Sequence, residues 1–251
     1  MKIAIVTGAS SGMGREMVCQ LAERFGGLRE IWVIARRTER LDDLKGRIPV
    51  RLKCLGLDLL TSEAVAVLKK ELSVVHPEVK ILVNAAGFGK TGAAGTISEE
   101  QSKGMVRLND EALVAVTGAV LPYMPENSRI IQFASAAAFI PQPGFAVYAA
   151  SKAFVLSYSR ALAAELRKKK IFVTAVCPGP VETEFFDIAL DGGTLTSYKK
   201  WVLEKPETVV SLAIRDSMKG KEISVAGPWM KLFFLLCKCL PHSLIMKWIT
   251  W

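Results

Sequence analysis

Along the chain, short apolar runs alternate with longer segments in which apolar residues recur every three or four positions. The short runs predict β-strands, and the periodic segments predict α-helices. We expect strands at residues 2–6, 30–35, 51–57, 81–83, 129–134, 171–176 and 222–225. We expect helices at residues 14–25, 40–46, 62–75, 101–123, 148–169 and 207–218. Strands that alternate with helices favour a parallel sheet with helices on both faces.

This order predicts an α/β fold, a Rossmann-like doubly wound fold with a parallel sheet of about seven strands. The chain has 251 residues and contains neither an internal repeat nor a linker, so one domain accounts for most of it. We expect residues 1–227 to form a single dinucleotide-binding and catalytic domain. Residues 228–251 would then form an apolar and basic C-terminal extension.

The composition narrows the classes of partner and compartment. The formal net charge is +9, and the positive charge is not gathered in one block. A basic chain favours phosphates or an acidic membrane surface, whereas no basic motif with interleaved aromatic residues indicates nucleic-acid binding. Five cysteines without paired spacing and two isolated histidines predict a cytoplasmic protein with reduced thiols and no metal site. The N-terminus runs directly into an apolar strand, so we expect no cleavable signal peptide.

A glycine-rich loop follows the first expected strand and precedes the first expected helix. Its sequence is Thr7-Gly8-Ala9-Ser10-Ser11-Gly12-Met13-Gly14-Arg15. Glycines permit tight turns and let a pyrophosphate approach the backbone, and a helix N-terminus attracts its negative charge. The spacing differs from the dinucleotide fingerprint Gly-x-Gly-x-x-Gly, but the position between strand and helix favours phosphate binding over a purely structural turn.

The ends of the second and third strands predict which dinucleotide binds. Arg36 and Arg37 follow the second strand, where an acidic residue would instead bind a ribose 2′-hydroxyl. Two arginines suit a 2′-phosphate, so we expect NADP(H) in preference to NAD(H), with a solvated arginine pair as the alternative. Asp58, after the third strand, is either a ligand of the adenine amino group or a turn residue.

Tyr148 and Lys152 stand four residues apart in an expected helix, so their side chains share one face. An ammonium beside a phenol favours the phenolate, which makes the tyrosine a candidate general acid and base. Taken alone, the pair also fits a core tyrosine beside a lysine that extends to solvent.

Several motifs occur in a fixed order: the glycine loop, Asn84-Ala85-Ala86-Gly87, Asn109, Ser135, Tyr148, Lys152 and Pro178-Gly179-Pro180-Val181-Glu182-Thr183. Over residues 2–227 this set resembles the short-chain dehydrogenase/reductase family. The resemblance implies a catalytic set of Asn109, Ser135, Tyr148 and Lys152. Tyr148 would exchange the proton, and Ser135 would bind the substrate oxygen. Lys152 would also hold the nicotinamide ribose, and Asn109 would distort its helix and hold a water of the proton relay.

Together with the two arginines and Asp58, the resemblance implies a set of cofactor-binding residues. They are Gly8, Ser10, Ser11, Gly12, Met13, Gly14, Arg36, Arg37, Asp58, Asn84, Ala85, Gly87, Tyr148, Lys152, Pro178, Gly179, Val181 and Thr183. Thr183 and the backbone of Val181 would bond the nicotinamide carboxamide. Ala85 departs from the usual Asn-Asn-Ala-Gly motif, which removes one polar contact.

Apolar residues border the implied active site and favour a lipophilic substrate. We expect substrate-pocket walls at Phe88, Phe139, Phe145, Phe185 and Phe186, although most aromatic residues in proteins belong to the core. Residues 184–201 would form a mobile lid. With the resemblance, these walls predict interconversion of a lipophilic ketone and its alcohol, with a hydroxysteroid as the first substrate class and a 3-oxoacyl chain as the second. The alternative is a non-catalytic dinucleotide-binding or membrane-docking protein.

The C-terminal extension combines apolar residues with Lys231, Lys238 and Lys247 and is broken at Pro241, so its apolar stretches are too short to span a bilayer. Three interpretations remain for residues 229–251: an amphipathic helix on a membrane surface, an oligomer interface or a cover over the substrate pocket. We favour contact with the membrane surface or substrate entry, which makes the protein cytoplasmic but peripheral to a membrane. The resemblance further implies a homodimer or homotetramer built on the helices at 101–123 and 148–169.

Overall fold

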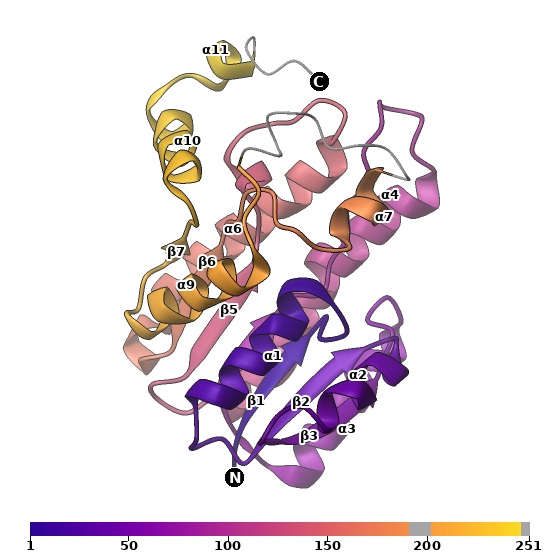
Figure 1. The fold of residues 1–251 in the computed structure, drawn as a ribbon, viewed down its shortest axis with the longest axis vertical. Coiled ribbons are helices and arrows are strands. Elements are labelled where there is room, and N and C mark those ends of the chain that lie inside the picture. Colours follow the sequence, from indigo (N-terminus) through magenta and orange to yellow (C-terminus); the bar gives the residue numbers. More distant parts are fainter. Residues whose placement is uncertain (191–201, 247–251) are drawn as a thin grey trace.

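The computed structural model describes residues 1–190 and 202–246. Within these residues one parallel sheet has the strand order β3-β2-β1-β4-β5-β6-β7 (Figure 1). The strands are β1 (Lys2–Thr7), β2 (Glu30–Ala35), β3 (Arg51–Gly56), β4 (Glu78–Asn84), β5 (Arg129–Phe133), β6 (Phe172–Val176) and β7 (Ile223–Ser224). Each predicted strand is present, and the Rossmann-like doubly wound fold is confirmed.

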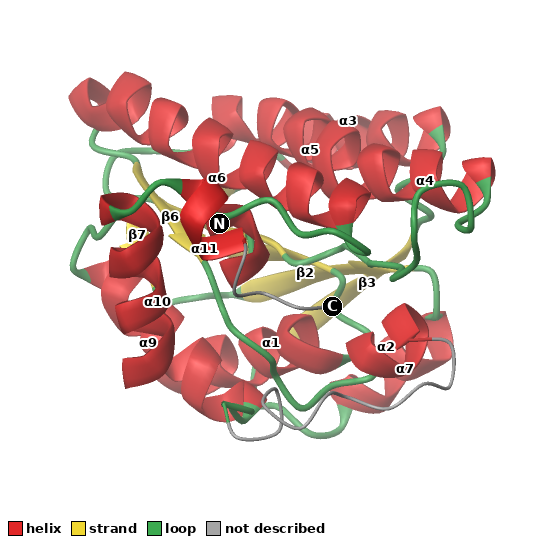
Figure 2. Ribbon diagram, turned by 90° about the horizontal axis from the view of Figure 1, so that it is seen from above, coloured by secondary structure: helices red, strands yellow, loops and turns green. Residues whose placement is uncertain are grey.

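Helices cover both faces of the sheet (Figure 2). On one face lie α1 (Gly12–Arg24), α2 (Thr38–Lys45) and α9 (Pro206–Met218). On the other face lie α3 (Ser62–Val75), α4 (Glu99–Val106), α5 (Ala112–Val120) and α6 (Ala146–Leu166). In β1, Ala4 and Val6 belong to the core under the first layer, and Ile3 and Ile5 belong to the core under the second. Because both faces are buried, the strand is apolar at successive positions instead of alternating.

The strand order reverses between β1 and β4, which places the carboxyl ends of these two parallel strands side by side. Thr7 at the end of β1 is in register with Asn84 at the end of β4. The glycine loop after Thr7 therefore meets the turn after Asn84. Ligands of open α/β sheets bind in the crevice outside such a switch point.

The helix expected at residues 101–123 is interrupted in its middle. After α4, a π-helical turn named η1 spans Arg107–Glu111, and α5 follows it before a final 3₁₀ turn, η2 (Leu121–Tyr123). π-helical turns inside α-helices are frequent at functional sites. The turn contains Asn109, where the family resemblance implies a distorted helix.

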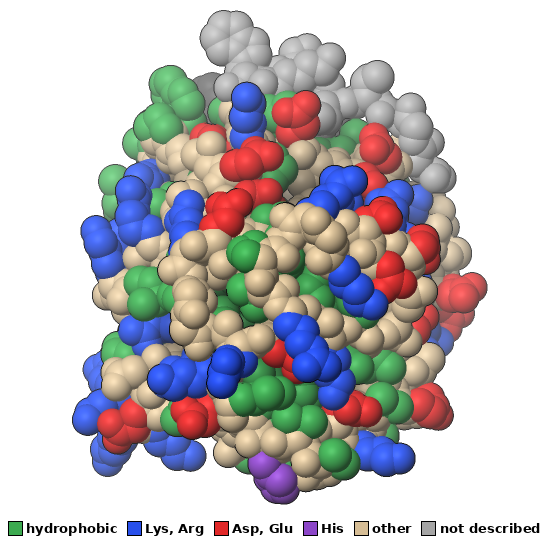
Figure 3. Space-filling view, turned by 60° about the horizontal axis from the view of Figure 1, so that its bottom comes forward, with side chains coloured by type: hydrophobic (Ala, Val, Ile, Leu, Met, Phe, Trp, Pro, Cys, Tyr) green, Lys and Arg blue, Asp and Glu red, His purple; other side chains and the backbone are tan. Residues whose placement is uncertain are grey.

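Two 3₁₀ turns and three further helices complete the part of the fold that the structure describes. They are η3 (Ala136–Phe139), η4 (Arg167–Lys169), α7 (Phe185–Leu190), α10 (Pro228–Cys239) and α11 (His242–Met246). α10, yellow in Figure 1, packs against η3. Among the described residues, no helix is long and apolar enough to cross a membrane. Lys and Arg side chains are interspersed with Asp and Glu over the face seen in Figure 3, in keeping with a basic charge that is spread along the chain.

Candidate functional site

The glycine loop is packed so tightly that side chains do not fit at its glycines. Gly8 and Gly12 have positive φ angles of 68° and 52°, which favour glycine. A Cβ on Gly14 would lie 2.2 Å from the carbonyl oxygen of Gly8, and a Cβ on Gly8 would lie 2.7 Å from the Ala85 backbone. The loop therefore brings the N-terminus of α1 close to the end of β4, where it can bind a phosphate.

A cavity of about 300 Å³ runs from the glycine loop across the ends of β2, β3 and β4. Of the predicted cofactor-binding residues it brings together Gly8, Ser10, Ser11, Gly12, Met13, Gly14, Arg36, Arg37, Asp58, Ala85, Gly87 and Thr183. A helix N-terminus and two arginines suit the anionic groups of a dinucleotide, and the bare glycines leave its approach open. The residues present therefore fit a nicotinamide dinucleotide.

Two of the predicted cofactor-binding residues, Asn84 and Asp58, form hydrogen bonds within the protein itself. The buried Asn84 amide donates hydrogen bonds to Thr117 Oγ1 (3.0 Å) and Gln132 Oε1 (2.9 Å). Asn84 does not line the cavity, and these bonds tie the end of β4 to β5 and α5. Asp58 does line the cavity, but its Oδ1 accepts a hydrogen bond from the backbone N–H of Leu60 (3.1 Å), as a turn residue does.

The two predicted arginines differ in how firmly they are held. Arg37 Nη2 donates to Ser11 Oγ (2.8 Å) and Ser10 Oγ (3.2 Å), and Arg37 Nη1 donates to Glu184 Oε2 (3.0 Å). The Arg36 side chain is 66% exposed at the rim. Arg37 is therefore the arginine that the glycine loop fixes in place.

Tyr148 and Lys152 lie one turn apart on α6, and both are buried. Lys152 Nζ is 5.7 Å from the centre of the Tyr148 ring and donates a hydrogen bond to the carbonyl oxygen of Phe133 (2.8 Å). Burial raises the pKa of the Tyr148 phenol to about 12, although its hydrogen bond with Ser135 acts in the opposite direction. Burial lowers the pKa of Lys152 to about 8. The ammonium is therefore mostly charged at neutral pH, where it favours a phenolate formed beside it.

Asn109 is held in the π-helical turn by three hydrogen bonds. Its Nδ2 donates to the Phe88 carbonyl oxygen and to Ser151 Oγ, and its Oδ1 accepts the Phe88 N–H, each at 3.0 Å. A Cβ on Gly87 would lie 2.8 Å from Asn109 Oδ1 and 3.3 Å from Lys152 Nζ. The absence of a side chain at Gly87 thus leaves a small space, and both the Asn109 amide and the Lys152 ammonium border it.

A second cavity, of about 470 Å³, is bordered by Ser135, Tyr148 and Lys152. Ser135 caps η3, and its Oγ accepts the N–H of Ala137 (3.1 Å). The cavity is also lined by three of the five predicted walls, Phe145, Phe185 and Phe186. Besides Tyr148 and Lys152, seven predicted cofactor residues line it: Met13, Ala85, Gly87, Pro178, Gly179, Val181 and Thr183. The Phe145 ring stacks on Tyr148 with the ring centres 4.3 Å apart. The phenol therefore lies against an apolar wall.

The remaining predicted walls lie elsewhere. Phe88 borders the first cavity, and Phe139 packs behind the second, with its ring centre 4.8 Å from that of Phe234 on α10. Met230 and Phe233 of α10 line the second cavity instead. The sequence analysis left three interpretations open for residues 229–251, among them a cover over the substrate pocket, and Met230 and Phe233 agree with that one. Residues 191–201 of the expected lid lie outside the described residues.

Asp110 is a buried acid that the sequence analysis did not single out. Burial raises the pKa of its carboxyl group to about 7, and the charge of Lys152 acts against this rise. Among the described residues, Asp110 Oδ1 has no hydrogen-bond partner. The sequence carried no signal for it, because an acid inside an amphipathic helix usually faces water.

Known proteins are similar to this chain in sequence and in fold. Residues 2–190 match the family model of the short chain dehydrogenases. The chain is 35% identical over 201 residues to sulfoacetaldehyde reductase 2 of Chromohalobacter salexigens, and this match covers 78% of this chain and 79% of that protein. It is 33% identical over 214 residues to the NADP-dependent 3-hydroxy acid dehydrogenase of Escherichia coli K12, and this match covers 82% of this chain and 85% of that protein.

A solved structure is similar over the whole fold. It is the short-chain dehydrogenase from Sphingobium yanoikuyae in complex with NADPH, with a TM-score of 0.80 and 25% sequence identity. The match covers 100% of this chain and 97% of that chain.

Replacing Gly14 with alanine should destabilise the fold. We expect Gly14→Ala to lower the free energy of unfolding by about 1–3 kcal/mol, because the new Cβ overlaps the Gly8 carbonyl group and forces the backbone to shift. Urea denaturation followed by circular dichroism measures the change. Gly26→Ala is the control, because nothing lies within 4 Å of a Cβ there. Equal losses in the two variants would contradict the close packing of the loop.

Proposed function

The chain belongs to the short-chain dehydrogenase/reductase family, and we propose that it is an NADP(H)-dependent oxidoreductase that interconverts a carbonyl and a secondary alcohol on a lipophilic substrate. Oxidoreductases of this family act on CH–OH groups. The observation that carries the proposal is the buried Tyr148–Lys152 pair, which borders an apolar cavity next to the cleft lined by the glycine loop.

In this proposal Tyr148 is the general acid and base. Its hydroxyl gives a proton to the carbonyl oxygen during reduction and takes it from the alcohol during oxidation. Ser135 Oγ donates a hydrogen bond to the same oxygen as negative charge develops there. When bound, the nicotinamide cofactor supplies or accepts the hydride. The glycine loop, Arg37 and Thr183 would hold that cofactor in the first cavity.

Lys152 supports Tyr148 electrostatically. Its ammonium stabilises the phenolate that remains once the proton has left, and Asn109 connects it to the return path of that proton. Below about pH 8 the ammonium retains its charge despite its burial, since its pKa is lowered only to about 8. The pair therefore suits catalysis near neutral pH.

Two observations support NADP(H) over NAD(H). Arg37 lies at the end of β2 with the hydroxyls of Ser10 and Ser11 beside it, and no acidic residue occupies this position. Among the relatives, one is named as NADP-dependent and the similar solved structure contains NADPH. A 2′-phosphate suits such a set of donors, whereas a 2′-hydroxyl is usually bound by an acid.

The apolar lining supports a lipophilic substrate. Phe145, Phe185 and Phe186 face Met230 and Phe233 around the 470 Å³ cavity, a volume typical of drug-sized ligands. A hydroxysteroid is the first substrate class, and a 3-oxoacyl chain is the second. The names of two relatives suggest sulfoacetaldehyde and 3-hydroxy acids as smaller, polar comparison substrates.

Oxidation of NADPH and NADH in the presence of candidate substrates tests the proposal. The panel contains ketosteroids, 3-oxoacyl thioesters, simple aromatic ketones, sulfoacetaldehyde and a 3-oxo acid. We expect turnover with NADPH on an apolar ketone, and Tyr148→Phe should lower kcat by about a hundredfold or more while NADPH still binds. Tyr158→Phe is the control, because Tyr158 lies on the same helix and lines neither cavity.

Two outcomes would contradict this function. Unchanged turnover in Tyr148→Phe would remove the proposed acid and base. Tight binding of NADPH without turnover of any substrate would favour a non-catalytic dinucleotide-binding protein.

We further propose that residues 1–227 are the catalytic domain and that the extension, residues 228–251, contacts an anionic membrane surface. The inner side of α10 lines the substrate cavity, while its outer side exposes Trp229, Leu232, Leu235 and Leu236 at 66%, 46%, 54% and 41%. Residues 223–251 include three lysines and no acidic residue, so their charge complements an anionic bilayer. The free cysteines support a reducing, cytoplasmic location for this peripheral protein.

Vesicle binding tests this contact. The wild-type chain should sediment with vesicles of phosphatidylglycerol and phosphatidylcholine, and Leu235→Glu should weaken binding about tenfold or more, because a charge replaces buried apolar area. Val74→Glu is the control, since Val74 is also exposed to solvent, at 72% against 54% for Leu235, but lies on α3. Failure of the wild type to bind the vesicles would refute membrane contact. A molecular mass of Leu235→Glu below that of the wild type in light scattering would also refute it, because a second copy of the chain would then cover this face.

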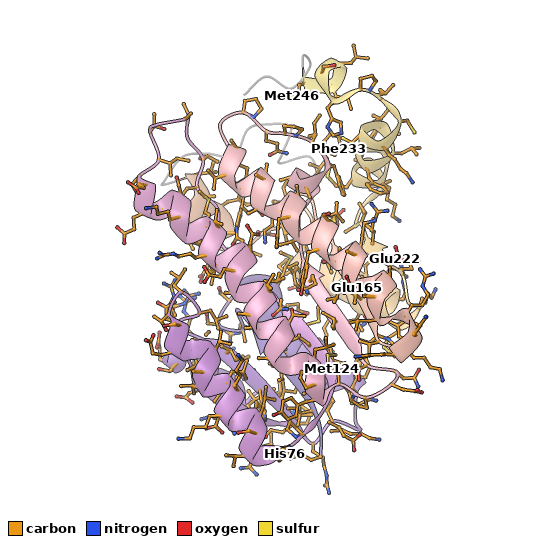
Figure 4. All side chains as sticks on the ribbon, turned by 180° about the vertical axis from the view of Figure 1, so that it is seen from behind. His76, Met124, Glu165, Glu222, Phe233 and Met246 are labelled. Carbon is orange, nitrogen blue, oxygen red and sulfur yellow. The ribbon has the colours of Figure 1, made fainter. Side chains whose placement is uncertain are left out.

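A homodimer or homotetramer is also part of the proposal. α4, η1 and α5 follow one another along one interrupted helix, which lies beside α6 on one outer face (Figure 4). Val106, Val114 and Phe154 on these helices are exposed. The Phe154 ring stacks on Tyr158 with centres 5.9 Å apart, so it offers a rigid apolar contact. Light scattering that gives the mass of one chain would contradict an oligomer.

A further inference from the structure

Glu184 joins the two sides of the cofactor cavity. It follows Thr183 in the segment after β6, and its Oε2 accepts a hydrogen bond from Arg37 Nη1 (3.0 Å). Its Oε1 pairs with Arg40 Nη1, so one carboxylate binds two guanidinium groups at the end of β2 and the start of α2. The hydrogen bonds from Arg40 and Arg37 lower the pKa of Glu184, which keeps it ionised at neutral pH.

Each of the side-chain nitrogens of Arg37 is engaged in this arrangement. Nε and Nη2 donate to Ser10 Oγ at 3.4 and 3.2 Å, and Nη2 also donates to Ser11 Oγ at 2.8 Å. Nη1 is the nitrogen that Glu184 occupies. These are the donors proposed above for a 2′-phosphate. A carboxylate of the chain itself therefore already uses a guanidinium group that the phosphate requires.

We propose that Glu184 is a specificity-determining residue whose carboxylate competes with the 2′-phosphate of NADP(H) for Arg37. Binding of NADP(H) must displace or share this carboxylate, whereas the neutral 2′-hydroxyl of NAD(H) does not need the guanidinium group. Glu184 thus limits the affinity for NADP(H) and leaves the affinity for NAD(H) unchanged. The inference rests on the proposed binding of the 2′-phosphate by Arg37.

The effect of this competition is small because water reaches the ion pairs. The side chains of Glu184, Arg37 and Arg40 are 43%, 39% and 37% exposed. Ion pairs this exposed alter an equilibrium by only a few fold, and salt screens them. The carboxylate can therefore be displaced by a phosphate, which carries more charge and forms bidentate contacts with arginine.

Affinities of Glu184→Gln for intact and fragment cofactors test the proposal. Glutamine keeps the size of the side chain but removes its charge. We expect NADPH and 2′,5′-ADP to bind about three- to fivefold more tightly than to the wild type at low salt, with NADH and 5′-AMP unchanged. Nicotinamide fluorescence measures NADPH and NADH, and calorimetry measures the fragments. Glu39→Gln is the control, because it removes the same charge at a residue of α2 that forms no ion pair with Arg37 or Arg40 in the described structure.

The outcomes separate this inference from the proposed cofactor preference. Unchanged affinity for NADPH in Glu184→Gln overturns the competition. Equal weakening of NADPH and NADH also overturns it, since Glu184 would then close the cavity over either cofactor. The ratio of NADPH to NADH affinity in the wild type tests the preference itself. A wild type that prefers NADH refutes that preference, yet a selective gain for NADPH in Glu184→Gln would still support the role of Glu184.

Discussion

Lys152 carries a charge in the interior of the protein, and the surrounding elements are arranged to keep it there. Burial disfavours the ammonium, and the carbonyl oxygen of Phe133 at the end of β5 compensates by accepting a hydrogen bond at 2.8 Å. Gly87 leaves space beside the ammonium, and the π-helical turn directs Asn109 into the same region. Tyr148 therefore has a charged neighbour only while four elements keep their relative positions. These are the end of β4, the end of β5, α6 and η1.

The sheet provides this rigidity through close backbone packing at the switch point. Asn84 is bonded to Gln132 across β4 and β5, while Gly8 and Gly14 bring the loop after β1 against the same strand. The cofactor cleft and the substrate cavity thus share one wall, formed by residues that have little room to move. Other elements cover this wall: α10 supplies Met230 and Phe233, and the segment after β6 supplies Phe185 and Glu184.

The sequence predicted the elements well because both faces of the sheet are buried, which leaves near-continuous apolar strands between periodic helices. Local spacing singled out the Tyr148–Lys152 pair and the glycine loop, and the family resemblance added Ser135. The structure brings Ser135, Tyr148 and Lys152 to one cavity. The sequence could not predict the direction of Phe139, which turns away from the cavity to pack on α10, or the reach of Glu184 across to Arg37. Both depend on partners distant in sequence, and periodicity specifies a face without specifying what covers it. Asp110 was missed because an acid in an amphipathic helix usually faces water, whereas here it is buried.

The pH dependence of kcat/KM for carbonyl reduction with NADPH tests the role of the buried ammonium most directly. The pKa of Lys152 is lowered by burial, so its charge is present below that pKa and is lost as the pH rises through it. If Tyr148 needs the charged lysine, kcat/KM falls with the loss of one proton centred near pH 8. A rate that stays constant through this range and falls only near the ordinary lysine pKa of about 10.4 would contradict the dependence of Tyr148 on a buried, perturbed ammonium.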